Sequence, residues 1–290
     1  MHTIWLIIEF AFWLIVIASF LHTLLTHFIL WYELRLSALL KGQSAEIPWF
    51  ILTKSFLIEF VCVFLNCIVF PIGFSKHAFN RSIPHSLETS NPLASNLPVL
   101  LVHGYLHNQS AWLWFIHALQ KQAGIGAIFS LNLNPPCASI VEFAEILKNK
   151  IHAIQTETGA EQIILIGHSM GGLVSSYYCE YLAPPGEINK IITLGTPFQG
   201  TRTGVLGVGK EIIEMAPESS FLSDLNERIQ QSKVPYYTIA SKIDNMIVPW
   251  EAALLPEGEA KEQLVLEDYG HMRLLISNIV VEQVSTWIRS

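Results

Sequence analysis

A run of four aliphatic residues leads directly into a Gly-x-Ser-x-Gly segment, and this junction constrains the fold more than any other part of the sequence. The run, residues 163–166, is largely β-branched, which is typical of a strand buried on both faces. Gly167, Ser169 and Gly171 follow at once, and an apolar helical pattern continues from Leu173. A serine on such a sharp turn points its hydroxyl out of the sheet, and its neighbours must be small because strand and helix nearly touch. The segment therefore predicts a nucleophile elbow with Ser169 as the nucleophile.

Strand and helix patterns alternate along residues 98–290. The predicted strands are 99–102, 127–133, 163–166, 190–197, 235–240 and 263–266. This alternation predicts an α/β fold with a mostly parallel sheet that is covered by helices on both faces. Ligands of such sheets bind at the carboxyl ends of the strands. Residues 198–233 have no strand pattern, and we expect them to form a cap over that site.

Residues suited to nucleophilic catalysis follow several of the predicted strands. A serine hydroxyl is a weak nucleophile at neutral pH and needs a neighbouring base, for which His271 is the candidate. An acid must orient that imidazole, and Asp244 fits because Ser, Asp, His is one of the chain orders in which such triads occur. The alternatives are His107 as the base and Asp268 or Asp224 as the acid.

An acyl-transfer site also needs N–H donors that are in place before the oxyanion forms. The backbone N–H of Met170 is one candidate, because it lies at the start of the elbow helix, where the helix dipole also favours an anion. The backbone N–H of Tyr105, just after strand 99–102, is the second candidate. His168 is expected to point away from the site. A glycine-rich turn with an idle serine is the alternative interpretation, but it gives no reason for these further residues at the strand ends.

Residues 1–74 have a different composition from the rest of the chain. The 290 residues are 51% hydrophobic and only 14% charged, whereas about 25% charged is usual for a soluble domain. Residues 4–31 and 49–74 are each long enough to cross the roughly 30 Å core of a bilayer, and we expect two membrane helices and a linker at 75–97. A cleaved signal peptide fits poorly, since no Lys or Arg precedes the first run. Buried helices of a soluble protein are the other alternative, but these are seldom apolar on all faces.

The charge pattern bears on the side of the membrane that carries the domain and on binding of nucleic acid, and the cysteine pattern bears on metals and cofactors. The basic residues on the two sides of the expected spans nearly balance, and the absence of positive charge at the N-terminus slightly favours a non-cytoplasmic domain. A net charge of −7 argues against nucleic acid as a partner. The four cysteines have no metal-binding spacing, so we expect neither a metal nor a cofactor.

Several segments between about residues 99 and 288 resemble the bacterial lipases and esterases of the α/β-hydrolase superfamily. The segments are Val-His-Gly-Tyr at 102–105, Gly-His-Ser-Met-Gly-Gly at 167–172, Thr-Leu-Gly-Thr-Pro-Phe-Gln-Gly-Thr at 193–201, Asp-Asn-Met-Ile-Val-Pro at 244–249, and Gly-His-Met-Arg-Leu-Leu at 270–275. The resemblance implies an α/β-hydrolase fold without the first antiparallel strands, and carboxylic esters, often of acylglycerols, as substrates. It also implies Ser169 as nucleophile, Asp244 as acid and His271 as base. Some relatives hold a structural calcium, whose ligands have no match here.

The sequence therefore predicts a membrane-anchored serine ester hydrolase that acts on lipid or other apolar acyl esters. In this interpretation residues 1–74 are the anchor and residues 98–290 are the catalytic domain. An acyltransferase or thioesterase with the same triad, and a non-catalytic protein that binds a partner, remain alternatives. Because no candidate catalytic residue lies in the anchor, a chain beginning near Ser75 is expected to stay active on short soluble esters.

Overall fold

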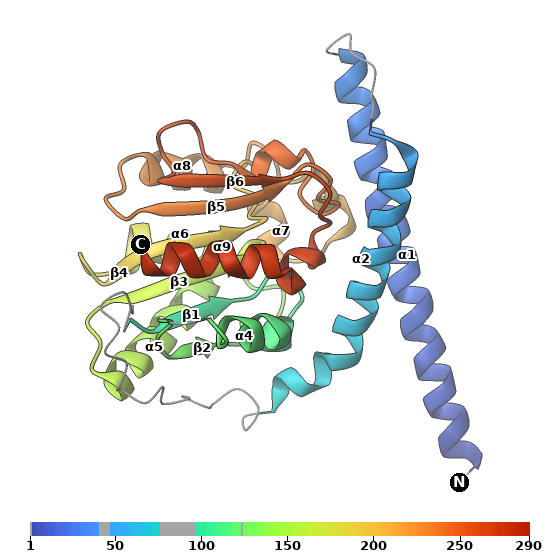
Figure 1. Cartoon of the computed structure of the whole chain (residues 1–290), viewed down its shortest axis with the longest axis horizontal. Coiled ribbons are helices and arrows are strands. Elements are labelled where there is room, and N and C mark those ends of the chain that lie inside the picture. The colour runs from blue at the N-terminus through green and yellow to red at the C-terminus, as the bar shows by residue number, and fades with distance from the viewer. Residues whose placement is uncertain (1, 41–46, 76–96, 123) are drawn as a thin grey trace.

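The computed structural model describes residues 2–40, 47–75, 97–122 and 124–290, so the expected linker lies almost wholly outside it. An N-terminal pair of helices stands beside an α/β domain (Figure 1). We call this pair the hairpin: it consists of α1 (His2–Leu40) and α2 (Trp49–Val69), and the short 3-10 helix η1 (Phe70–Phe74) continues α2. By length and composition, both helices could cross a membrane.

The α/β domain is built on six strands in the order β2-β1-β3-β4-β5-β6. The strands are β1 (Val99–Val102), β2 (Ile128–Ser130), β3 (Ile163–His168), β4 (Ile188–Leu194), β5 (Tyr236–Ser241) and β6 (Glu262–Leu266). All neighbouring strands pair in parallel, which confirms the predicted parallel sheet without leading antiparallel strands in the described part of the chain.

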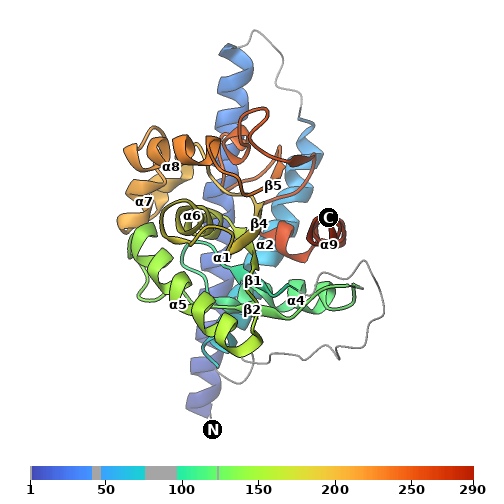
Figure 2. The same ribbon diagram turned by 90° about the vertical axis from the view of Figure 1, so that its left-hand side faces the viewer.

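Helices cover both faces of this sheet and create two apolar cores (Figure 2). On one face lie α5 (Ile140–Thr158) and α6 (Met170–Tyr177), and on the other lie α4 (Leu113–Leu119) and α9 (Asn278–Arg289). The central strands β1 and β3 are buried along their whole length, as parallel strands covered on both faces must be.

Two separate helices follow His271, and the break between them matters for the site. A 3-10 helix, η6 (Met272–Ile276), begins directly after His271, and α9 starts only after Ser277. The Ser277 hydroxyl accepts the N–H of Val280 and so begins a new helix at that point. The segment between β4 and β5, which we call the cap, is helical and contains η4 (Arg202–Leu206), α7 (Lys210–Glu214) and α8 (Ser220–Gln230).

The hairpin lies against the carboxyl ends of the strands, where it covers the edge of the sheet that carries the site (Figure 1). Leu30 of α1 is buried in a small apolar cluster with Ile243 and Val248 of the domain. The Lys54 ammonium of α2 lies 3.0 Å from the carboxylate of Asp268. The sequence did not predict this docking, because a pattern that is apolar on all faces carries no information on which face meets protein.

Candidate active site

The segment around Ser169 forms the sharp turn that its sequence predicts. Ser169 joins β3 to α6 with φ 55° and ψ −129°, a left-handed conformation that is strained for a residue with a side chain. A Cβ atom on Gly171 would lie 2.1 Å from the carbonyl oxygen of Val102, and one on Gly172 would lie 1.9 Å from Oγ1 of Thr196. Only glycine fits at these two positions, so the glycines are what allow the strand and the helix to approach each other.

Hydrogen bonds fix the strained turn on both sides. The Thr196 hydroxyl donates to the carbonyl oxygen of Ser169 at 3.0 Å, and the Ser169 N–H donates to the carbonyl of Leu194 at 2.9 Å. Leu194 is the last residue of the neighbouring strand β4, and Thr196 lies just after it. Both partners are therefore at the end of β4, beside the elbow. The turn is therefore held rigidly, and the serine hydroxyl faces a cavity at the end of the sheet.

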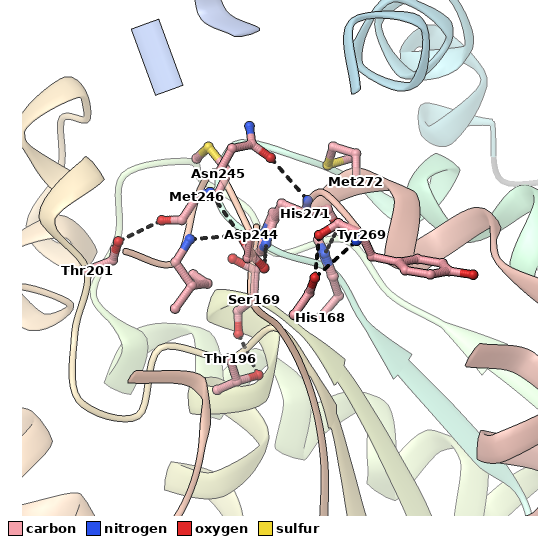
Figure 3. A network of polar contacts seen from close by, with 12 residues as sticks. His168, Ser169, Thr196, Thr201, Asp244, Asn245, Met246, Tyr269, His271 and Met272 are labelled. Carbon is pink, nitrogen blue, oxygen red and sulfur yellow. Dashed lines mark hydrogen bonds and ion pairs between the residues drawn. The ribbon is translucent and has the colours of Figure 1, made fainter. Parts of the chain in front are cut away.

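Asp244 and His271 form a buried pair near this serine (Figure 3). Nδ1 of His271 lies 2.9 Å from Oδ2 of Asp244, and the two side chains are almost wholly buried. The other carboxylate oxygen, Oδ1, accepts the N–H groups of Met246 and Ile247, both at 2.8 Å. An acceptor-only carboxylate suits all three contacts, and it fixes the ring with Nδ1–H toward Asp244 and Nε2 free to accept a proton.

His271 and Ser169 line the same cavity. In the part of the chain that the structure describes, no hydrogen bond joins the serine hydroxyl to the histidine ring. Such bonds are often long in free enzymes and shorten when substrate binds. The arrangement thus places the candidate nucleophile and the candidate base around one cavity, and a carboxylate already orients the ring of the candidate base.

His168 packs under His271, so the expectation that it points away from the site is wrong. The two ring centroids are 4.4 Å apart, and Nε2 of His168 lies 3.3 Å from the carbonyl oxygen of His271. The loop that carries His271 passes over the end of β3, and this brings the rings together. Burial lowers the pKa of His168 well below its ordinary value, and the nearby His271 lowers it further, so His168 supports the base as a neutral ring.

The alternative residues lie in other surroundings. Asp268 pairs with Lys54 and Arg273, and the hydrogen bond from Lys54 is the first cause of its lowered pKa. His107 lines the cavity but turns Nδ1 toward the backbone of Asn108, which donates its N–H at 2.9 Å. Asp224, the third alternative, lies on α8 in the cap. Among the described contacts, the carboxylate that reaches His271 is that of Asp244.

Two backbone N–H groups flank the serine as candidate oxyanion donors. Met170 is the first residue of α6, where a helix leaves its N–H groups without intrahelical partners. Tyr105 lies on the other side, and its hydroxyl donates to the carbonyl of Val208 in the cap at 2.7 Å. A Cβ atom on Gly104 would lie 2.9 Å from Cβ of Ser169, so the loop that carries Tyr105 directly adjoins the nucleophile.

The loop is held in place from below by His103. Nε2 of this ring accepts the N–H of Leu133 at 3.0 Å, and Nδ1 lies 2.9 Å from the carbonyl oxygen of Gly104. Burial lowers the pKa of His103 to about 3, so the ring is neutral at physiological pH. The neutral tautomer with a proton on Nδ1 satisfies both contacts at once.

The cavity in front of Ser169 has a volume of about 600 Å³, which is in the range of small-molecule and lipid sites. Its wall is mainly apolar and comes from three regions, one of which is the set of domain loops that carry Tyr105, Ser169 and His271. The cap contributes Leu206, Val208, Ile212 and Met215, and the hairpin contributes Ala18, His22, Glu59, Val63 and Phe70. No cluster of three or more His, Cys, Asp or Glu within the described residues could hold a metal ion.

Sequence reasoning missed the contribution of the hairpin to this wall. One signal was present: isolated ionisable residues such as His22 and Glu59 interrupt otherwise apolar helices. An ionisable group in such a segment marks a functional surface more often than it marks lipid contact. That signal identifies the residues, but it does not identify the part of the chain that they meet.

Sequence comparisons relate parts of the α/β domain to known proteins. Residues 129–263 match the sequence family described as the PGAP1-like alpha/beta domain. A stretch of 57 residues is 42% identical to phospholipase A(1) LCAT3 of Arabidopsis thaliana; it covers 19% of this chain and 12% of the length of that protein.

Solved structures share the fold at low sequence identity. The mature lipase BlEst2 of Bacillus licheniformis superposes with a TM-score of 0.59 at 18% identity, over 69% of this chain and 94% of that chain. Lipase B of Aspergillus fumigatus gives a TM-score of 0.58 at 18% identity, over 70% and 55% of the two chains. The domain thus has the fold of these lipases.

Proposed function

We propose that this chain, an α/β hydrolase related to lipases and esterases, is a membrane-associated serine hydrolase that cleaves carboxylic esters of lipids. One observation carries the proposal: His271, which is paired with the buried Asp244, and the strained Ser169 border a single, mainly apolar cavity. A scaffold without catalytic activity would have no use for a buried acid–base pair beside a strained serine.

The proposed reaction uses these groups in two half-reactions. The Ser169 oxygen attacks the acyl carbon while Nε2 of His271 takes the hydroxyl proton, and Asp244 stabilises the resulting imidazolium. The N–H groups of Met170 and Tyr105 bind the oxyanion. The intermediate collapses as His271 returns the proton to the departing alcohol. Water, deprotonated by the same ring, then attacks the acyl-serine, and the ring returns that proton to the Ser169 oxygen as the acyl–oxygen bond breaks and the carboxylic acid leaves.

The substrate class follows from the wall of the cavity and from its surroundings. Aliphatic side chains of the cap and the hairpin form much of the wall, which suits an acyl chain. Val205 and Ile213 of the cap are 83% and 74% exposed. Many large apolar side chains of the hairpin are also exposed. Exposed apolar surface of this extent is typical of contact with lipid. The phospholipase named among the relatives supports a lipid ester as substrate.

The hairpin is proposed as the membrane anchor, with the catalytic domain on the non-cytoplasmic side, as the charge placement in the sequence favours. In the docked arrangement, the face of the hairpin that meets the domain is closed to lipid. Its opposite face is the one that contacts the bilayer.

Replacement of the nucleophile tests the proposal. Ser169→Ala is expected to lower turnover of p-nitrophenyl butyrate by about 10⁴- to 10⁶-fold and to abolish labelling by a fluorophosphonate, without a change in thermal melting. Product analysis with vesicles that contain phospholipid or acylglycerol would separate hydrolysis from acyl transfer, since transfer gives a new ester in place of a free acid. A variant that turns over the ester at the parental rate would refute the assignment of Ser169.

A further inference from the structure

The hairpin presents a line of polar side chains to the loops that carry Asp244 and His271. Ser19, Thr26 and Glu59 are almost wholly buried, although they lie in helices whose outer faces are apolar. Two of them make hydrogen bonds to the domain. Thr26 bonds to Asn245, the residue after Asp244, and Glu59 bonds to the two residues that follow His271. These contacts join the hairpin to the residues proposed for catalysis.

Glu59 of α2 holds the chain immediately after His271. Its carboxyl oxygens accept the N–H of Met272 at 3.0 Å and the N–H of Arg273 at 2.8 Å. These residues open the 3-10 helix η6, where N–H groups lack partners within the helix, and a carboxyl group at that point is a strong acceptor. A Cβ atom on Gly270 would lie 2.1 Å from Cγ of Glu59, so the loop is shaped around this side chain.

Thr26 of α1 acts on the same loop through one intermediate, Asn245. The Asn245 amide nitrogen donates to the Thr26 hydroxyl at 2.8 Å, and its amide oxygen accepts the N–H of His271 at 3.1 Å. The Thr26 hydroxyl in turn donates to the carbonyl of Thr23 at 3.2 Å, which leaves its lone pairs for the amide. Asn245 directly follows Asp244 in the chain, so one side chain joins the acid loop, the base loop and the hairpin.

His271 is therefore fixed at three points. Asp244 fixes its ring, Asn245 fixes its backbone N–H, and Glu59 fixes the two N–H groups that follow it. The second point depends on a residue of α1, and the third is a residue of α2. A displacement of about 1 Å in a reacting group can cost about 10²-fold in rate, so these supports bear directly on turnover.

We propose that Glu59 and Thr26 are positioning residues, through which the docked hairpin sets His271 and Asp244 in their working geometry. The inference rests on the proposed function, since it assigns His271 as the base. It makes the hairpin a part of the active site, in addition to any role as an anchor.

The test uses the full-length protein in detergent and a short soluble ester, so that access to a bilayer plays no part. Glu59→Gln replaces one acceptor oxygen by a donor, and it is expected to lower kcat about 10- to 100-fold with KM changed less than twofold. Thr26→Val keeps the shape of the side chain and removes only the hydroxyl, with an expected loss in kcat of about 3- to 10-fold. Glu59→Asp retains the carboxyl group and should recover part of the rate that Glu59→Gln loses.

A matched control removes a contact between the hairpin and the domain that does not involve the catalytic loops. Glu33 of α1 pairs with Arg202 of the cap, and neither lines the cavity. Glu33→Gln should therefore leave kcat within twofold of the parent. If general docking were all that mattered, Glu33→Gln and Glu59→Gln would lower kcat alike.

A spectroscopic readout separates positioning from stability. The His271 Nδ1–H proton shared with Asp244 should give a strongly downfield proton resonance in the parent, identified by its loss in Asp244→Asn. In Glu59→Gln this resonance should broaden or vanish while thermal melting stays close to that of the control. If Glu59→Gln does not fold, the same two measurements on Thr26→Val decide the question.

Parental kcat together with an unchanged resonance, in folded Glu59→Gln or in Thr26→Val when Glu59→Gln does not fold, would overturn the positioning role. Activity that survives Ser169→Ala would instead overturn the proposed function itself, so the two failures can be told apart.

Discussion

The α/β domain and the hairpin distribute polarity in opposite ways. The domain buries aliphatic strands such as Val99–Val102 and turns charged side chains outward, as a protein surrounded by water does. The hairpin leaves large apolar side chains such as Trp5 and Phe10 about 70% exposed and buries Glu59 against the domain. By this difference, the outer face of the hairpin is suited to hydrocarbon, and its inner face is suited to a polar site.

The comparison also separates two kinds of contribution to the candidate site. The domain supplies the proposed nucleophile, acid and base from three strand ends. The hairpin supplies none of these groups, but it supplies hydrogen bonds to the loops of two of them and part of the cavity wall. Variants of each region should therefore fail in different ways.

The largest expected effect belongs to the domain and concerns the acid. Asp244→Asn should lower kcat by about 10⁴-fold, because the neutral amide no longer stabilises the protonated ring or its tautomer. Asp268→Asn should change kcat less than threefold, since this carboxylate pairs with Lys54 and Arg273 at the surface. Steady-state kinetics on a soluble ester gives both values. The reverse ranking would move the acid to Asp268.

The next effect belongs to the outer face of the hairpin. Ile17 and Leu24 lie seven residues apart on α1 and are 54% and 46% exposed. A lysine at the centre of a membrane helix costs about 2.5–3.5 kcal/mol, so Ile17→Lys combined with Leu24→Lys should release much of the protein from membranes during carbonate washing. Turnover of a soluble ester in detergent should stay within twofold. Full membrane retention of this double variant would show that the exposed face does not meet lipid.

The inner face of the hairpin changes an expectation drawn from the sequence. The sequence alone predicts that a chain beginning near Ser75 keeps its activity on short esters, because the leader holds no member of the proposed triad. The hydrogen bonds of Glu59 to Met272 and Arg273 argue against that independence, since the truncated chain would lose a support of the base.

The smallest effect concerns stability in acid and belongs to the domain alone. His103 has a pKa of about 3 in the folded protein against about 6.5 when unfolded, because burial disfavours its charge. Between pH 6.5 and pH 3 the unfolded chain therefore binds a proton at this histidine that the folded chain does not bind. The resulting stability is fully present above pH 6.5 and is lost as the pH falls from there toward 3, by about 1.4 kcal/mol per pH unit.

Denaturant titrations between pH 7 and pH 5 measure this loss. His103→Gln should lower the slope of the unfolding free energy against pH by the equivalent of one bound proton. Between pH 6.5 and pH 5 this amounts to about 2 kcal/mol of acid destabilisation that the variant no longer shows. His152→Gln, at an exposed position of α5, is the matched control for the exchange of a histidine for a glutamine. An equal slope in the parent and in His103→Gln would show that His103 is not held neutral by the fold.

Sequence patterns predicted the domain far better than they predicted its surroundings. The aliphatic runs around Ser169 and the turn glycines predict the parallel sheet and the elbow, because burial on both faces and steric contact leave few alternatives. The chain order that selected Asp244 and His271 reflects strand ends that meet at one edge of a sheet.

The features that the sequence did not predict are polar contacts between residues far apart in the chain. Nothing local in Glu59 indicates that its partners lie more than 200 positions later, and the position of His168 under His271 depends on where a distant loop passes. An all-round apolar helix also gives no sign of which side another part of the chain will cover. These features follow from tertiary packing, which periodicity does not encode.

The contact between Glu59 and Met272 also sets an order of events during synthesis. The two residues are 213 positions apart, so a ribosome that adds 5–20 residues per second completes the second about 10–40 s after the first. Throughout that interval the nascent chain carries its membrane-active helices and later its serine, but the loop that holds the base does not yet exist. Under the proposed function, ester cleavage would begin only when translation is nearly finished, so a membrane that receives the growing chain would be protected from it until then.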